Sequence, residues 1–240
     1  MCPIRARKEG NAMKRSLAMI LALALAFTLT ACGEPESPSN NSAEPEQTEQ
    51  PTQNQDQEQE PAYVPHDPIV FTGSGDDVLE IESPDYYFGF RITGNAVGKH
   101  FAVKTYNSSG DYSELLVNTS DQYSGVTYDP SIDVSMIEVT AEGEWTIEVV
   151  DLVTLDIIET GDTITGNGDY VFSLYEHGKT ATISGNAAGH YFAVKSYDNY
   201  GRYSDLLVSS SDPYEGKVML GNDDTIVSVT AIGDWSFTLN

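Results

Sequence analysis

Residues 92–240 contain one pattern twice, and this repetition constrains the fold more than any other feature. Residues 92–125 and 183–216 are identical at 20 of 34 positions, with a constant offset of 91. The segments VTAEGEWTIEV and VTAIGDWSFTL follow them with an offset of 90, so the offset changes only where a loop is expected. Repetition at a fixed period indicates two copies of one structural unit. We therefore predict two tandem domains, over residues 67–150 and 151–240.

Within each copy, apolar and polar residues alternate with the period of a β-strand. Phe101 and Val103 fall on one face of such a strand and Lys104 on the other, while Trp145 and Trp235 alternate with polar residues and are expected in the cores. Gly, Asn, Asp and Ser punctuate these runs about every eight to twelve residues. We predict an all-β fold of two antiparallel β-sandwiches of the jelly-roll or immunoglobulin-like type. The strands expected in the first copy span residues 77–82, 86–93, 99–106, 112–118, 123–128, 134–140 and 144–150.

The N-terminal segment has the organisation of a bacterial export signal. Lys14 and Arg15 precede an apolar run of about 14 residues, which is shorter than the roughly 20 needed to span a membrane. The run ends in LTAC, which has the form of a lipobox whose cysteine, Cys32, becomes diacylated. We predict a signal peptide over residues 1–31 with its true start at Met13. The mature protein is then an extracytoplasmic lipoprotein held on the cell membrane, the alternative being an ordinary signal peptide with an incidental cysteine.

A polar linker and a strong negative charge follow the expected anchor. From the lipidated cysteine, residues 32–66 are mostly Glu, Gln, Pro, Asn and Ser, a composition that favours a disordered linker. The whole chain has 12 Lys and Arg against 37 Asp and Glu, a formal net charge of −25. Such a charge repels nucleic acid and anionic lipid or wall polymer, and it favours cations and basic partners. With Cys2 outside the mature chain, Cys32 has no partner for an internal disulfide.

Four segments of the first copy resemble a module that is repeated in exported bacterial proteins. They are GSGDDV, HFAVKTYNSSGDYSELLVN, a Tyr-x-Gly and the closing GEWTIEV. The resemblance implies a β-sandwich fold and an exported location, and it implies no activity. Those modules carry Asn before Phe-Ala-Val, whereas His100 and Tyr191 stand at that position here.

No pattern in the sequence indicates catalysis, so we predict a protein without enzymatic activity, cofactor or resident metal. A G-x-S-x-G elbow is absent, and the four histidines lack the spacing of a zinc site. A carboxylate pair for glycoside hydrolysis is the enzymatic alternative. The acidic turns at 107–110 and 198–201 contain oxygen ligands suitable for calcium, but Asp or Asn followed by Gly also meets the requirement of a hairpin turn, which is the favoured interpretation.

The outward face of one strand in each copy is the candidate binding surface. It combines aromatic rings with a lysine, in domains that have few cations, and such rings give rigid contact area with a polar tip. A plain solvent face is the alternative. The candidate residues are His100, Lys104 and Tyr106 in the first copy and Tyr191, Lys195 and Tyr197 in the second.

These observations together predict a surface protein that presents two binding or adhesion modules. The expected partner is a glycan, an envelope polymer or another protein, in addition to the membrane that holds the lipid. The alternative is an accessory or spacer subunit without a ligand of its own. The two hypotheses differ in whether both lysine–tyrosine faces are open or packed.

Overall fold

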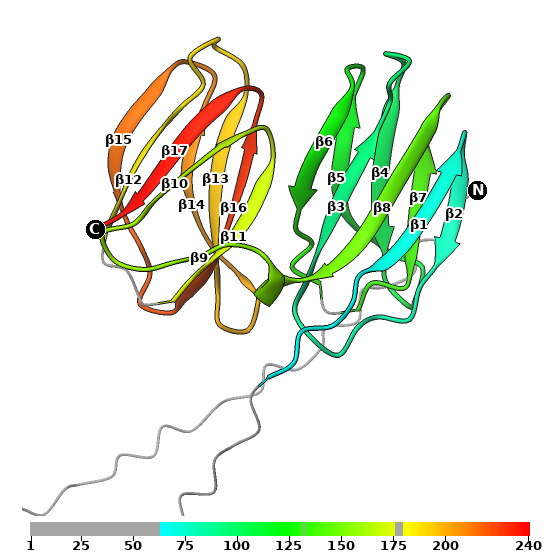
Figure 1. Ribbon diagram of the computed structural model, residues 1–240, viewed down its shortest axis with the longest axis horizontal. Helices are drawn as coiled ribbons and strands as arrows, with labels where there is room; N and C mark the ends of the chain where they lie inside the picture. The colour runs from blue at the N-terminus through cyan, green and yellow to red at the C-terminus, as the bar shows by residue number, and fades with distance from the viewer. Residues whose placement is uncertain (1–62, 132, 176–179) are drawn as a thin grey trace, which may run out of the picture. The chain divides into compact units, whose positions relative to one another are not determined.

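The computed structural model describes residues 63–131, 133–175 and 180–240 (Figure 1). In these ranges the chain forms strands β1 to β17 and one 3-10 turn, η1 (Leu152–Thr154), so the prediction of an all-β fold is confirmed. The expected signal peptide, the lipidated Cys32 and most of the linker lie outside the described residues. No helix within the described residues is long and apolar enough to cross a membrane.

The first sandwich consists of two four-stranded antiparallel sheets. Their orders are β1-β8-β3-β6 and β2-β7-β4-β5, so consecutive strands alternate between the two sheets except β4 and β5, which are neighbours in one sheet, as in a jelly roll. The strands are β1 (Ile69–Ser74), β2 (Asp77–Glu80), β3 (Phe88–Gly94), β4 (Phe101–Tyr106), β5 (Tyr112–Thr119), β6 (Tyr123–Thr127), β7 (Met136–Thr140) and β8 (Glu144–Asp151).

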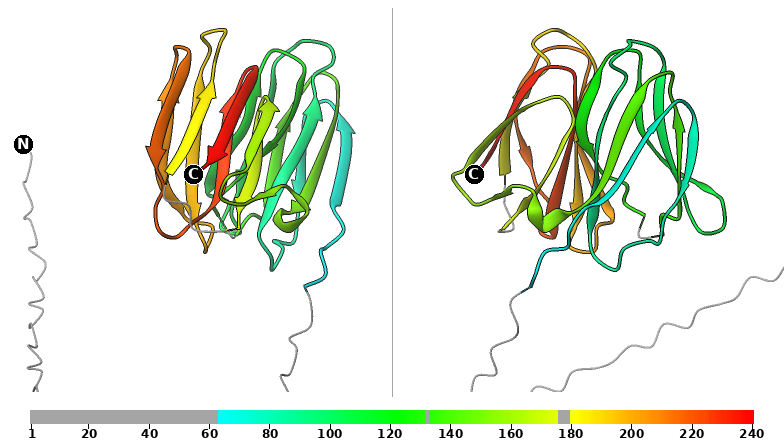
Figure 2. Two further views of the ribbon diagram at one scale, coloured as in Figure 1. Left: turned by 60° about the vertical axis from the view of Figure 1, so that its left-hand side comes forward. Right: turned by 45° about the vertical axis from the view of Figure 1, so that its right-hand side comes forward.

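The second sandwich has the same order of eight strands. Its sheets are β10-β17-β12-β15 and β14-β13-β16-β11, and the short β9 extends the second sheet by pairing in parallel with β11. The two layers can be followed in the turned views of Figure 2. The strands are β9 (Ile157–Ile158), β10 (Thr163–Asn167), β11 (Tyr170–Leu174), β12 (Thr180–Gly185), β13 (Phe192–Asp198), β14 (Tyr203–Ser210), β15 (Tyr214–Met219), β16 (Asp224–Ala231) and β17 (Asp234–Leu239).

Each sandwich has its own apolar core, with a tryptophan packed against a glycine. Trp145 and Trp235 are 3% and 4% exposed, which confirms their expected place. Each indole nitrogen donates to a carbonyl at a neighbouring turn, at 2.9 Å for Gly75 and 2.8 Å for Gly168. A Cβ on Gly166 would lie 2.4 Å from the Trp235 ring, so this position requires glycine.

A third apolar cluster joins the two sandwiches inside the compact unit Gln59–Asn240. Val126 and Tyr128 at the end of β6 pack there with Tyr197 and other side chains of the second sandwich. The Tyr123 hydroxyl donates to Asp169 Oδ2 at 2.8 Å, and the Val126 amide donates to the Asp169 carbonyl at 3.0 Å. The two copies therefore share a desolvated contact in addition to their separate cores.

The end of the expected linker contacts the first sandwich, which corrects the prediction of a disordered segment up to His66. Asp151, only 2% exposed, accepts hydrogen bonds from the Tyr63 hydroxyl and from the His66 backbone amide. The His66 ring also stacks on Tyr86, with a centroid distance of 4.1 Å. The Tyr63 and His66 rings also lie edge to face, with centroids 5.8 Å apart.

Candidate functional site

In the first sandwich, two of the predicted binding residues are held by one carboxylate. Lys104 Nζ lies 3.0 Å from Glu138 Oε1, and the Tyr106 hydroxyl donates to Glu138 Oε2 at 2.5 Å. The hydrogen bonds from Tyr106 and Lys104 lower the pKa of Glu138 below its ordinary value. Lys104 and Tyr106 are both only half-exposed, and the polar groups of both already bond to the carboxylate of Glu138.

In the second sandwich, the expected exposure of Tyr197 is wrong. Tyr197 is 3% exposed and its ring packs edge to face on Tyr128, with centroids 4.8 Å apart. Burial raises the pKa of Tyr197. The face that carries Tyr197 and the half-exposed Lys195 is thus partly covered by the first sandwich, whereas the equivalent face with Tyr106 is not.

The remaining two predicted residues lie just before β4 and β13 and are exposed. His100 Nε2 is 3.2 Å from Asn118 Oδ1, and Tyr191 is 53% exposed beside a hollow that also contains Asn118 and Asp169. The structure therefore does not bring the six predicted residues together into one site.

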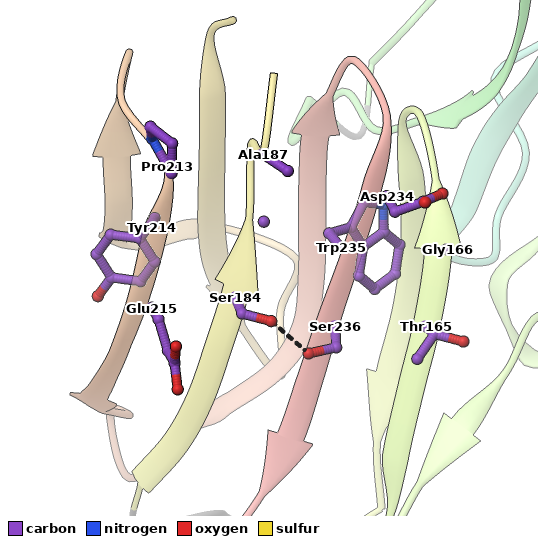
Figure 3. A pocket seen from close by; sticks show the side chains of 11 residues that line it. Thr165, Gly166, Ser184, Ala187, Pro213, Tyr214, Glu215, Asp234, Trp235 and Ser236 are labelled. Carbon is purple, nitrogen blue, oxygen red and sulfur yellow. Dashed lines mark hydrogen bonds between the residues drawn. The ribbon is translucent and has the colours of Figure 1, made fainter. Parts of the chain in front are cut away.

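A different surface has the features of a site: a broad shallow hollow of about 810 Å³ on the sheet β10-β17-β12-β15 (Figure 3). Its floor includes Thr165, Ser236 and Ser184, which are cross-strand partners on three adjacent strands. The Ser184 and Ser236 hydroxyl oxygens lie 2.8 Å apart. We call Thr165, Ser236 and Ser184 the Ser/Thr row.

Two carboxylates and an aromatic ring extend the Ser/Thr row. Glu215 is the next cross-strand partner, opposite Ser184, and it is exposed. Asp234 is also exposed and accepts a hydrogen bond from Asn167 Nδ2 at 2.7 Å. Tyr214 lines the same hollow and is half-exposed, as Figure 3 shows beside Glu215. Trp235 also lines the hollow, but its burial excludes it as a stacking platform.

The same face of the first sandwich repeats the hydroxyl pattern. Thr72 pairs with Thr146, Thr146 with Thr93, and Thr93 with Ser124. Four hydroxyl side chains therefore lie side by side as cross-strand partners on the four strands of that sheet. Ser124 occupies the position of Glu215, so the carboxylate at this end of the row belongs to the second sandwich alone.

The side chains around the hollow provide hydrogen-bonding groups for a ligand. Hydroxyls donate and accept hydrogen bonds, and carboxylates accept them. The lining contains no histidine, cysteine, lysine or arginine, so it has no cationic side chain to pair with an anionic ligand, and its two carboxylates are those of Glu215 and Asp234. Among the residues that the structure describes, no group of three or more His, Cys, Asp or Glu is placed to hold a metal ion.

Alternating Ser and Thr residues in the sequence are a signal for this surface. In TIT at 163–165, TATIS at 180–184 and WSFT at 235–238, Ser or Thr occupies every second position. The intervening apolar residues point into the core, so the hydroxyls share the outer face. Their alignment into a row depends on the pairing of strands that are distant in sequence.

Comparisons with known proteins give no family. No family model and no curated protein matches the chain. A conserved protein of unknown function from Pseudomonas aeruginosa has 10% identity and a TM-score of 0.22, over 71% of this chain and 78% of that one. A regulatory subunit of a cAMP-independent protein kinase A from Trypanosoma cruzi, bound to guanosine, has 9% identity and a TM-score of 0.21 over 72% of each chain. At these scores the comparisons carry no argument, and function rests on the residues.

Proposed function

We propose that the protein is an exported, lipid-anchored binding protein that takes up an uncharged glycan on the Ser/Thr row of its second sandwich. The observation that carries the proposal is the in-register row of hydroxyls on three adjacent strands, continued by Glu215, inside a shallow hollow of about 810 Å³. An open hollow on a sheet face suits an extended ligand, such as a chain of sugars.

Electrostatics support an uncharged ligand. The chain has a net charge of −25, and Glu215 and Asp234 add negative charge at the hollow itself. An anionic polymer is repelled by such a field. Sugar hydroxyls instead donate to the carboxylates and exchange hydrogen bonds with Ser and Thr, while Tyr214 offers ring surface to the apolar side of a sugar.

The glycan proposal is tested on the mature chain with Cys32→Ser, which keeps the protein in solution. Glycan arrays followed by calorimetry should detect a neutral oligosaccharide. Ser184→Ala and Ser236→Ala should each weaken its binding by about five- to tenfold, because each removes a hydrogen bond of about 1 kcal/mol.

The double variant Lys104→Ser/Tyr106→Ser is the matched control, since it changes the sequence-predicted face and leaves the hollow intact. It should bind the same oligosaccharide with unchanged affinity. Loss of binding in this control, with retention in Ser184→Ala, would move the site to the lysine–tyrosine face. An array without any neutral ligand would favour the spacer hypothesis.

The anchor is a separate part of the proposal. The lipobox ending at Cys32 should yield a mature protein that begins with a diacylated cysteine. Mass spectrometry of the membrane fraction checks this directly. Cys32→Ser should release the protein from the membrane or stop its processing, whereas an unmodified soluble mature chain from the unaltered gene would contradict it.

A further inference from the structure

A second hollow, of about 410 Å³, lies within the first sandwich and has a different chemistry. Its wall includes the aromatic side chains of Tyr86, Tyr87, Phe88 and Tyr128. Two carboxylates, Asp85 and Asp129, also line it together with Pro84 and Ser131, and its lining includes no lysine, arginine or histidine. A volume of this size is in the range of small-molecule sites.

Asp129 is a buried carboxylate without an opposing charge. It is 2% exposed, and its oxygens accept hydrogen bonds from the hydroxyls of Thr105 and Ser113 and from the Ser131 amide. Four ion pairs form between the side chains that the structure describes, and none of them includes Asp129. The three hydrogen bonds satisfy its oxygens, and its negative charge, which no described cation balances, favours a cationic ligand in the hollow.

The tyrosine rings beside Asp129 are fixed in position. The Tyr87 hydroxyl donates to the Asn199 carbonyl and the Tyr128 hydroxyl to the Gly201 carbonyl, both at 3.0 Å. Tyr86 is held by its stacking on His66. Because the Tyr87 and Tyr128 hydroxyls are engaged with the backbone, these two residues present mainly ring surface to the hollow. Because these rings are already fixed before a ligand binds, little side-chain entropy is lost on binding.

Ring surface next to carboxylates favours an organic cation over a metal ion. A divalent metal needs several oxygen ligands, and the described residues offer no cluster of that kind. A quaternary ammonium group instead loses its weak hydration readily and is attracted by the faces of aromatic rings. We propose that this hollow binds a small quaternary ammonium compound, with Asp129 and Asp85 as counter-charges and Tyr86, Tyr87 and Tyr128 as the surrounding rings. This site is independent of the Ser/Thr row.

The test uses the mature chain with Cys32→Ser and isothermal titration with choline, tetramethylammonium and 3,3-dimethylbutan-1-ol. The last compound has the shape of choline without its charge. We expect one molecule of choline or tetramethylammonium per chain, and binding of the neutral compound weaker by about tenfold or more. Equal binding of choline and its neutral analogue, or no binding of either cation, would overturn the proposal.

Variants separate a site from general attraction by an acidic protein. Tyr87→Leu removes a partly exposed ring and leaves the charge unchanged, and it should weaken choline binding by about fivefold or more. Tyr175→Leu, at a 71% exposed tyrosine outside the hollow, should leave binding unchanged. Asp129→Asn should also weaken binding, and circular dichroism must show that it folds. If Tyr87→Leu and Tyr175→Leu bind choline equally, the attraction is non-specific and the assignment is wrong.

Discussion

Replacing Gly166 with alanine should lower the free energy of unfolding by about 2–3 kcal/mol, because it overpacks a core that has no room. The added Cβ would lie 2.4 Å from Trp235 Cζ2. The indole cannot move aside freely, since it is 4% exposed and its nitrogen donates to the Gly168 carbonyl. Urea denaturation of the Cys32→Ser chain, followed by tryptophan fluorescence, measures the loss.

The neighbouring substitution Thr165→Ala is the control for this prediction. Thr165 is exposed on the same strand, and surface changes usually stay within about 0.5 kcal/mol. Gly73→Ala should reproduce the effect in the first sandwich, where the added Cβ would lie 2.2 Å from Trp145. Wild-type stability in both glycine variants would show that the indoles have space to shift.

Replacing Asp151 with alanine should cost about 3 kcal/mol of stability, the second large effect that we expect. The buried carboxylate accepts from the Tyr63 hydroxyl, the His66 amide and the Val153 amide. Hydrogen bonds to a charged group contribute about 1.5–3 kcal/mol each, and they are not additive within one network. Removing the acceptor should also release residues 63–66, which hydrogen exchange of the His66 amide would detect.

The contribution of Asp151 should depend on pH in a defined direction. Burial raises its pKa, but the hydrogen bonds from Tyr63, His66 and Val153 outweigh burial and leave the pKa below its ordinary value. A lowered pKa in the folded state gives stability that is complete above the unfolded pKa of about 3.9 and lost as pH falls through the folded value. The difference between wild type and Asp151→Ala should therefore shrink in strong acid.

Glu142→Ala is the control for Asp151→Ala, because Glu142 is exposed at the turn between β7 and β8. It should leave stability nearly unchanged at every pH. A pH-independent gap between wild type and Asp151→Ala would contradict the role assigned to the ionised carboxylate.

The fold was largely predictable because it depends on patterns that are local in sequence. Alternation at Phe101 and Val103 follows from the geometry of a strand, and both side chains are fully buried. The seven expected strands of the first copy end within two residues of the observed ones. Strand β1 was not predicted, since Ile69 and Val70 are adjacent and both exposed at a sheet edge, where alternation is weak.

The candidate site was less predictable because it depends on contacts between segments far apart in sequence. Tyr106 and Tyr197 occupy equivalent positions, and the sequence gives no reason to treat them differently. Tyr197 is buried in a cluster that includes Tyr128, 69 positions earlier, and Val126 of the first sandwich. The Ser/Thr row likewise requires β12 to pair with β17, an arrangement that alternation alone does not specify.

The most direct test of glycan binding at the Ser/Thr row is an amide NMR titration of the Cys32→Ser chain with the neutral oligosaccharide found on the array. The largest shifts should map to Thr165, Ser184 and Ser236 and their neighbours on β10, β12 and β17. Saturable shifts confined to the first sandwich, or to the face of Lys195 and Tyr191, would contradict a site on the Ser/Thr row.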